Sequence, residues 1–459
     1  MKLRFLLLRL FQLGLLLGLV SCAEPRAVTI TPGATPAVAT RVQQTATPQQ
    51  AVVAEVTVES ADVTPRPSPI PSATIGPTAT LSGSACGQLL PIRLPPTSTR
   101  YDWVTPPIDN GLLPADAVPA VEYFFDHPED VALVVYRVGY EGVGFYHNAD
   151  QPMPLASLSK LLQLVGYGLA VDAGTLSPDQ PVAAADLEAY YLPRSDLGAH
   201  NEALRDLDED NLTLKDIVWM MIRHSANTAA DYLHDLLGQR RLEELVVEMG
   251  LGEHSAPCTF LGRFLAMAPP ASLSNSDLDL YLADPRFYGE DLVRMSELYR
   301  NDSSYRAIIQ SYWGQRGQPS VLVQREFVAE FETQGTAAGY AALMAGLVTG
   351  QIGSPTSNAA MRAELEWPYR EFPSNQENYQ VIGYKNGTLP GVLTTAYYAW
   401  PNWSDQPLVL VLFYRNIPTE TYQQWRRDLP HDSFAHWLMS NPNAIHIMHV
   451  WRDTAAGGG

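Results

Sequence analysis

The chain has few cysteines and a deficit of basic residues. Only three of its 459 residues are cysteine, and none forms a CxxC pair or a Cys/His cluster with zinc-ligand spacing. We therefore expect no metal site and no cofactor. Lysine and arginine number 30 against 49 aspartates and glutamates, a formal net charge of −19. Because like charges repel, this acidity disfavours nucleic acid as a partner.

A long N-terminal segment has no aromatic residues. Residues 23 to 82 contain no Phe, Trp or Tyr and are rich in Thr, Pro, Ala, Val and Ser. Such a composition has too little apolar surface to bury, and its prolines favour extended backbone. We predict a disordered tether over residues 22–84.

The first 21 residues have the pattern of a secretory signal peptide. Basic residues precede an apolar run that reaches Val20, and the stretch "LVSC" ends at Cys22. "LVSC" resembles a bacterial lipobox, in which the cysteine is lipidated and becomes the mature N-terminus. The alternative is a plain signal peptide cut elsewhere. We expect an exported lipoprotein, anchored to a membrane through Cys22 and facing the extracytoplasmic side.

Lipidation of Cys22 leaves Cys86 and Cys258 as a pair. In an oxidising compartment two remaining cysteines favour a disulfide. The alternative is two unpaired thiols, Cys258 buried and Cys86 in a loop.

Residues 85–459 contain enough apolar and aromatic residues for a large folded domain. Apolar, β-rich runs occur early (131–138 and 142–149) and late (379–387, 391–400 and 407–415), with a mostly helical middle. We predict an α+β fold, an α/β/α sandwich. Its five-stranded antiparallel sheet is formed by both chain ends, with a mostly helical lobe between them.

Polar residues begin an otherwise apolar helix. In "PLASLSKLLQLVGYGLAVDAG", leucines and valines recur at helical spacing, yet Ser157 and Lys160 stand one turn apart at the start. They are either packing accidents or a nucleophile and its base. The same question applies to Ser225 and Asn227, which lie between two predicted helices in "RHSANTAADYL".

A third polar group lies on a late strand, in "YKNGTLPG". Residues two apart face the same side of a strand, so Gly387 would leave open space beside the Lys385 ammonium for a ligand. Taken alone, each of the three groups is weak, because each short pattern also occurs in ordinary turns and solvated edges.

The order SxxK, SxN, KxG along one chain resembles the serine β-lactamase and penicillin-binding protein superfamily. The resemblance covers residues from about 115 to 440. It implies that Ser157 is the acylated nucleophile and that Lys160 accepts or relays the serine proton. It further implies that Ser225 passes a proton to the leaving nitrogen.

The same resemblance implies the substrate-binding groups. Asn227 would bind the substrate amide and steady Lys160, and Lys385 would supply positive charge for a substrate carboxylate. The backbone N–H groups of Ser157 and Thr388 would form the oxyanion hole. Asn386 and Gly387 complete the predicted binding strand.

The sequence departs from the family pattern in three places. Ala226 stands where class A enzymes usually have aspartate, and Asn386 where a hydroxyl is usual. The E-x-x-L-N segment, whose glutamate activates the deacylating water, is absent, and an insertion covers about residues 253–335 instead. Glu326 lies nearest the expected place of that glutamate, although Glu326 and Glu330 also fit solvated helix charges.

These patterns favour a serine hydrolase of the class A β-lactamase type, which opens the β-lactam amide through an acyl-serine intermediate. One alternative is a D-Ala-D-Ala peptidase or penicillin-binding protein that acts on cell-wall peptides. A second alternative is a non-catalytic cell-wall binding or sensor lipoprotein. The expected partner is thus a small β-lactam or a cell-wall peptide.

Overall fold

The computed structural model describes residues 86, 88–90, 104–106, 108, 111–207, 209–267 and 276–457. The predicted signal peptide, Cys22 and the predicted tether lie outside the described residues. Within the described part, no helix combines the length and apolar character needed to cross a membrane.

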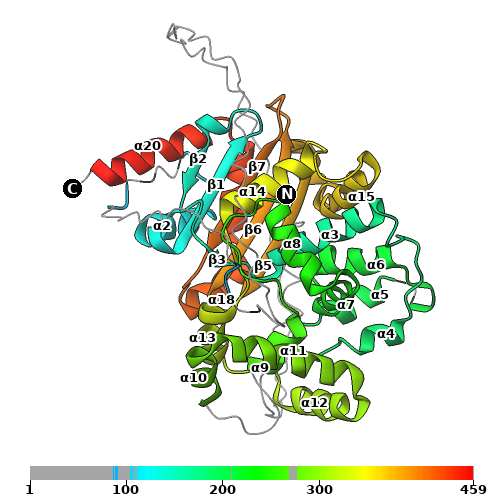
Figure 1. The fold of residues 1–459 in the computed structure, drawn as a ribbon. Helices are drawn as coiled ribbons and strands as arrows, with labels where there is room; N and C mark the ends of the chain where they lie inside the picture. Colours follow the sequence, from blue (N-terminus) through cyan, green and yellow to red (C-terminus); the bar gives the residue numbers. More distant parts are fainter. Residues whose placement is uncertain are drawn as a thin grey trace, which may run out of the picture. The chain divides into compact units, whose positions relative to one another are not determined.

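A five-stranded antiparallel sheet forms the centre of the domain (Figure 1). Its spatial order is β2-β1-β7-β6-β5, so strands from both chain ends pair at β1 and β7. This confirms the predicted fold class. The strands are β1 (Val131–Arg137), β2 (Phe145–His147), β5 (Tyr379–Leu389), β6 (Val392–Pro401) and β7 (Leu408–Tyr414). The predicted strand 142–149 is shorter, because a 3-10 turn, η2 (Glu141–Val143), occupies its start.

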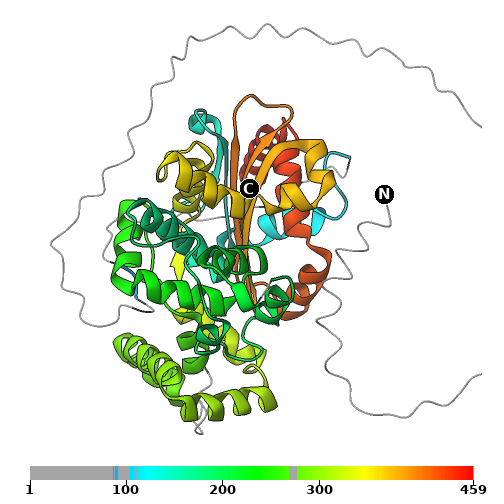
Figure 2. The same cartoon turned by 90° about the vertical axis from the view of Figure 1, so that its right-hand side faces the viewer.

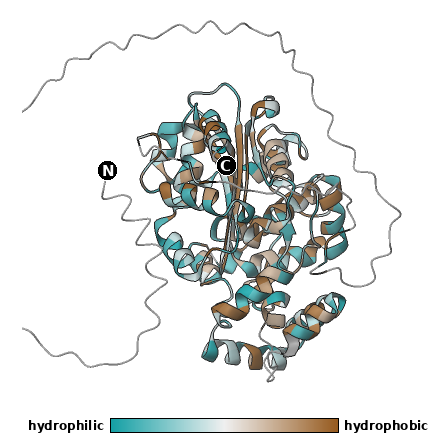
Figure 3. Ribbon diagram, turned by 90° about the vertical axis from the view of Figure 1, so that its left-hand side faces the viewer, coloured by the Kyte–Doolittle hydropathy of each residue, from teal (hydrophilic) through white to brown (hydrophobic). Residues whose placement is uncertain are grey.

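Both faces of the sheet are covered by helices, as the edge-on view shows (Figure 2). Alternate residues of one strand enter different cores: Ala132 and Val134 face one layer, whereas Leu133 and Val135 face the other. Because both faces are buried, the central strands are apolar almost throughout and appear brown in Figure 3.

One helical layer belongs to the middle of the chain. Its helices are α3 (Lys160–Asp172), α4 (Ala184–Glu188), α5 (Ala199–Arg205), α6 (Leu214–Trp219), α7 (Asn227–Leu237), α8 (Gln239–Glu248), α14 (Ala337–Val348) and α15 (Pro355–Leu365). The opposite layer comes from the chain ends: α2 (Val118–Asp126), α18 (Thr419–Asp428), α19 (Pro430–Ser440) and α20 (Ala444–Gly457). The short helices α16 (Trp367–Glu371) and α17 (Pro373–Asn378) contact β5.

Helix α3 runs through the core of the helical layer. Every residue from Lys160 to Gly168 is buried, so the helix has no solvated face over this stretch. The leucines and valines at helical spacing are therefore only part of its buried surface. The consequence is chemical, because Lys160 is buried along with the leucines around it.

The predicted insertion folds into helices with a core of their own. They are α9 (Phe260–Met267), α10 (Ser276–Ala283), α11 (Pro285–Asn301), α12 (Ser303–Arg316) and α13 (Val321–Phe331), drawn in yellow-green at the lower end of Figure 1. Aromatic residues dominate this core, among them Tyr299, Trp313 and Phe331. The chain returns to the main domain through β4 (Gln334–Gly335), which pairs with β3 (Met153–Pro154) directly before Ser157.

A disulfide joins Cys86 to Cys258, with the two Cα atoms 5.7 Å apart. Both cysteines are buried, and Cys258 belongs to the core of the insertion. The bridge closes a sequence separation of 172 residues. A loop of this length corresponds to about 5 kcal/mol in the chain-entropy treatment, and measured losses on removing native bridges are about 2–5 kcal/mol.

We expect the Cys86→Ala/Cys258→Ala double variant to lose about 2–5 kcal/mol of unfolding free energy, because its unfolded chain is less constrained. Urea unfolding of the variant and the parent chain measures the difference. Thiol counting on the unfolded, unreduced parent chain provides the check. Two free thiols from this pair would contradict the bridge.

Candidate active site

Ser157 lies in a 3-10 turn, η3 (Ala156–Ser159), that leads directly into α3. The α-helix itself begins at Lys160, three residues later than the sequence pattern indicates. Ala156 has a φ of 50°, in the left-handed region that residues with a Cβ rarely adopt. Such strained backbone is common beside catalytic groups, and here it orients the turn that presents the half-buried Ser157.

The Lys160 amine is the centre of a hydrogen-bond cluster. Its Nζ lies 3.1 Å from Ser157 Oγ, 2.8 Å from Asn227 Oδ1 and 2.5 Å from the Ser225 carbonyl oxygen. The side chain is fully buried. The first two motifs of the sequence therefore meet at one nitrogen atom.

Ser225 connects Lys160 to the third motif. Its Oγ lies 3.4 Å from Lys160 Nζ and accepts from Lys385 Nζ at 3.0 Å. Ser225 has a φ of 63° and ends the short π-helix η5 (Met220–His224) just before α7. Because π-helical turns and left-handed residues carry strain, their coincidence at Ser225 is typical of a functional position.

Lys385 and Gly387 lie on β5, at the edge of the sheet. A Cβ atom added at Gly387 would stand 2.4 Å from the Leu155 carbonyl oxygen and 2.8 Å from the Ser157 nitrogen. The prediction that Gly387 leaves open space beside Lys385 is therefore wrong. The glycine instead lets the strand backbone pack directly against the turn that carries the nucleophile.

The two neighbouring polar residues of β5 differ in their contacts. The Thr388 hydroxyl lies 2.9 Å from Tyr422 OH on α18, so only its backbone N–H is left for the predicted oxyanion hole. Asn386 accepts from Lys385 Nζ through its backbone oxygen at 2.8 Å. Within the described residues its side-chain amide has no hydrogen-bond partner, so its role in substrate binding stays a prediction.

Two buried carboxylates near Lys160 were not predicted. Asp231 accepts from the backbone nitrogens of Phe260 and Leu261 at 2.7 and 2.6 Å, and its burial raises the pKa to about 6. Glu332 forms a buried ion pair with Arg263. Asp231 follows Asn227 by four residues on α7, so helical spacing places both on one face and was the available signal.

The Phe260 ring is a second feature that the motifs do not reveal. Lys160 Nζ lies 4.4 Å from the centre of this ring, and the Arg263 guanidinium lies 4.3 Å from the same centre. The Phe260 ring therefore contacts both the Lys160 amine and the guanidinium of the Arg263–Glu332 ion pair. Within the described residues, neither Asp231 nor Glu332 hydrogen-bonds to Ser157.

Glu326 lies on an exposed part of α13. In the described part of the chain, no hydrogen bond or ion pair joins it to the Ser157 cluster. Its arrangement resembles that of a solvated helix charge, and a role as deacylating base stays a prediction without geometric support.

Burial changes the protonation of both lysines. Desolvation, followed by the charge of Lys385, holds the pKa of Lys160 well below its usual range. Desolvation alone lowers the pKa of Lys385 to about 7. A neutral Lys160 can accept the Ser157 proton, whereas a protonated Lys385 attracts an anionic substrate.

We expect kcat/KM for acylation by a carboxylate-bearing β-lactam to fall above about pH 7, because the free enzyme then loses the Lys385 charge. At lower pH it should fall again, because Lys160 becomes protonated. Stopped-flow acylation across pH measures both limbs. An ester analogue without the carboxylate is the control, and an equal fall above pH 7 for both compounds would contradict the role of Lys385.

Comparison with known proteins agrees with this geometry. The family model described as "Beta-lactamase enzyme family" matches residues 120–432, more than half of the chain. Among curated proteins no match is found.

Solved structures show distant likeness. A β-lactamase from Sphaerobacter thermophilus is 21% identical with a TM-score of 0.46, covering 74% of this chain and 99% of that one. A protein described as PBP-A is 17% identical with a TM-score of 0.40, covering 66% and 89%. A β-lactamase from Xanthomonas campestris is 16% identical with a TM-score of 0.43, covering 67% and 90%. On the family match, which spans the Ser157, Ser225 and Lys385 motifs, the chain belongs to the β-lactamase enzyme family.

Proposed function

We propose that this chain forms an acyl-serine at Ser157 by opening the amide bond of β-lactams. The observation that carries the proposal is the contact of Ser157 Oγ with the fully buried Lys160 amine, 3.1 Å away. Burial lowers the pKa of Lys160 well below its usual range, which makes the neutral amine more accessible than in a solvated lysine and suits it to act as a general base.

The contacts support a complete route for acylation. Lys160 takes the proton of Ser157 Oγ, and the oxygen attacks the lactam carbonyl carbon. The negative charge that develops on the carbonyl oxygen meets the backbone N–H groups of Ser157 and Thr388. Ser225 then donates its proton to the ring nitrogen as the C–N bond breaks, and it regains a proton from Lys160.

Hydrolysis of the acyl-enzyme has less support than its formation. A deacylating water needs a base, but Asp231 binds two backbone N–H groups and Glu332 pairs with Arg263. Phe260 adds an apolar ring beside Lys160. We therefore propose that acylation is fast and deacylation slow.

This balance favours a D-Ala-D-Ala peptidase or penicillin-binding role as the second candidate function. Such an enzyme uses the same acyl-serine, but β-lactams leave it as a long-lived adduct. The observation in its favour is that, within the described residues, no carboxylate hydrogen-bonds to Ser157. A cell-wall sensor that retains the adduct is a further alternative.

Rapid mixing with nitrocefin separates these functions. We expect a burst of about one ring opening per chain, followed by slow turnover. Sustained turnover without a burst would indicate an efficient β-lactamase and contradict slow deacylation. If nitrocefin gives no burst and no turnover, the proposed acylation chemistry itself is contradicted.

We further propose that the chain is an exported lipoprotein anchored at Cys22. The support is the signal-peptide pattern and the stretch "LVSC" in the sequence. Residues 23 to 82, which contain no Phe, Trp or Tyr, would serve as the tether. Mass analysis of the N-terminal peptide from membranes tests this, and an unmodified Cys22 would reject the anchor.

A further inference from the structure

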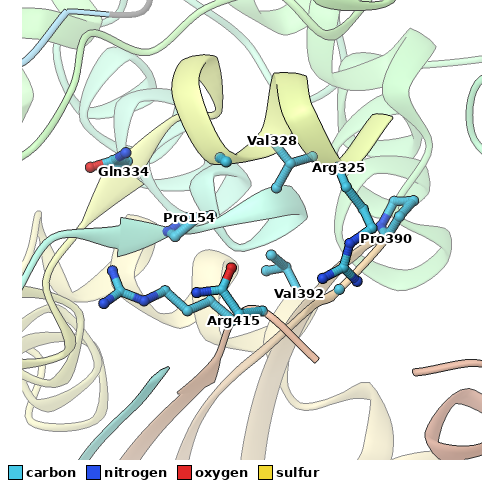
Figure 4. A pocket seen from close by; sticks show the side chains of 10 residues that line it. Pro154, Arg325, Val328, Gln334, Pro390, Val392 and Arg415 are labelled. Atoms are coloured by element: carbon cyan, nitrogen blue, oxygen red, sulfur yellow. The ribbon is translucent and has the colours of Figure 1, made fainter. Parts of the chain in front are cut away.

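A cavity of about 170 Å³ lies where the insertion meets the hairpin of the third motif (Figure 4). Helix α13 contributes Arg325 and Val328, the β5–β6 turn contributes Gly391, and the end of β7 is followed by Arg415. Pro154 of β3 completes the wall. None of the residues so far assigned to the acylation reaction lines it.

Arg325 brings a positive charge to this cavity. One of its Nη atoms donates to the Ile417 carbonyl oxygen, and the guanidinium packs against Gly391, where an added Cβ would clash with it. Within the described residues Arg325 has no carboxylate partner. The other cavity arginine differs, since Arg415 Nε donates to Asp130 Oδ1 at 3.1 Å.

The neighbouring acidic group is already engaged. Asp130 Oδ1 also accepts from Asn416 Nδ2 at 2.8 Å, so this oxygen hydrogen-bonds to Arg415 and Asn416, whereas no hydrogen bond joins it to Arg325 within the described residues. In a chain with a net charge of −19, an unpaired guanidinium in a cavity is unusual. Its remaining N–H groups can bind a carboxylate with charge-assisted hydrogen bonds.

The cavity is close to the nucleophile along two chain segments. Pro154 precedes Ser157 by three residues, and Gly391 follows Gly387, which packs on the Ser157 nitrogen, by four. Three to four residues span at most about 14 Å. Because β5 is an edge strand, a peptide can lie along it and reach the turn.

We infer that this cavity binds an acidic side chain on the acyl side of a peptide substrate, with Arg325 as the specificity-determining residue. The inference rests on the proposed acyl-serine function and names its substrate class. A substrate carboxylate on the leaving-group side would lie near Lys385 instead. A second carboxylate about two residues before the scissile bond can reach Arg325.

The test uses two peptides with a free C-terminal carboxylate that differ only in glutamate or glutamine two residues before the scissile bond. Equilibrium binding is measured on the Ser157→Ala chain, so that neither peptide is acylated. We expect the glutamate peptide to bind about 10-fold more tightly, as for one charge-assisted hydrogen-bond contact. Adding Arg325→Gln should abolish this ratio, and Arg325→Lys should retain part of it.

Arg286→Gln is the matched control, since Arg286 is an exposed arginine of the same insertion, and it should leave the ratio unchanged. Equal binding of both peptides, no binding of either, or a ratio that survives Arg325→Gln would overturn the inference. Labelling of the parent chain by penicillin tests the proposed acylation independently of peptide binding. A labelled chain with a ratio of one therefore rejects the cavity assignment alone.

Discussion

Ser157→Ala is expected to abolish covalent labelling by any β-lactam while leaving the fold intact. The hydroxyl is the only group in the cluster placed to be acylated, with its oxygen 3.1 Å from the Lys160 amine. The loss should be about 10⁴-fold or more in acylation rate, as for removal of a nucleophile in other serine enzymes. Intact mass after incubation with penicillin measures it.

Ser159→Ala is the matched control for this substitution. Ser159 lies in the same 3-10 turn, but its hydroxyl donates to the Ala156 carbonyl oxygen at 2.9 Å and does not face Lys160. The Ser159→Ala variant should therefore be labelled by penicillin to the same extent as the parent chain. A Ser157→Ala variant that still gains the mass of the drug would reject the nucleophile assignment.

Lys160→Ala should reduce the acylation rate by about 10²–10⁴-fold, the usual contribution of a positioned general base. No other basic side chain contacts Ser157 Oγ within the described residues, so no neighbour can replace it. Single-turnover acylation by a fluorescent penicillin measures the rate. Lys215→Ala, on the exposed side of α6, should leave it unchanged.

A structural effect of Lys160→Ala is separable from the chemical one. Removing the buried amine leaves the Asn227 and Ser225 oxygens without their donor and opens a cavity, so we expect a folded variant of lower stability, by about 2–5 kcal/mol. Thermal unfolding of both lysine variants supplies this comparison. A Lys160→Ala variant that is folded and is acylated at the parent rate would contradict the assignment of Lys160 as the general base.

Much of the sheet follows from local sequence pattern. The runs that became β1 and β7 are continuous apolar stretches, which indicate strands covered on both faces. Pairing between them joins residues such as Val131 and Tyr414, and the antiparallel register follows from their common burial. The short β2 was less predictable, because the residues of the turn before it, Glu141–Val143, are compatible with a strand as well as with a 3-10 turn.

The catalytic cluster was predictable as a set of motifs but not as a network. Spacing within the SxxK motif places Ser157 one turn from Lys160, and that contact holds in the structure. The ion pair of Arg263 with Glu332 joins residues 69 positions apart, across helices with a separate core. No local pattern identifies such a pair, although its Arg263 contacts the same Phe260 ring as Lys160.

Gly387 is a position whose role depends on a distant part of the chain. A glycine two residues after a strand lysine fits either open space for a ligand or close backbone packing. Only the position of the Ser157 turn against β5 distinguishes the two, and it favours packing. The prediction failed because the partner of the strand lies more than 200 residues away along the chain.

The most direct test of the central claim is to locate the β-lactam on the wild-type chain. Penicillin is mixed with the protein, the reaction is stopped within seconds, and the digested chain is mapped by mass spectrometry. We expect one adduct per chain, with the opened penicillin on the peptide that contains Ser157, attached to the Ser157 hydroxyl. An adduct on any other residue, or neither an adduct nor hydrolysed penicillin, would contradict it.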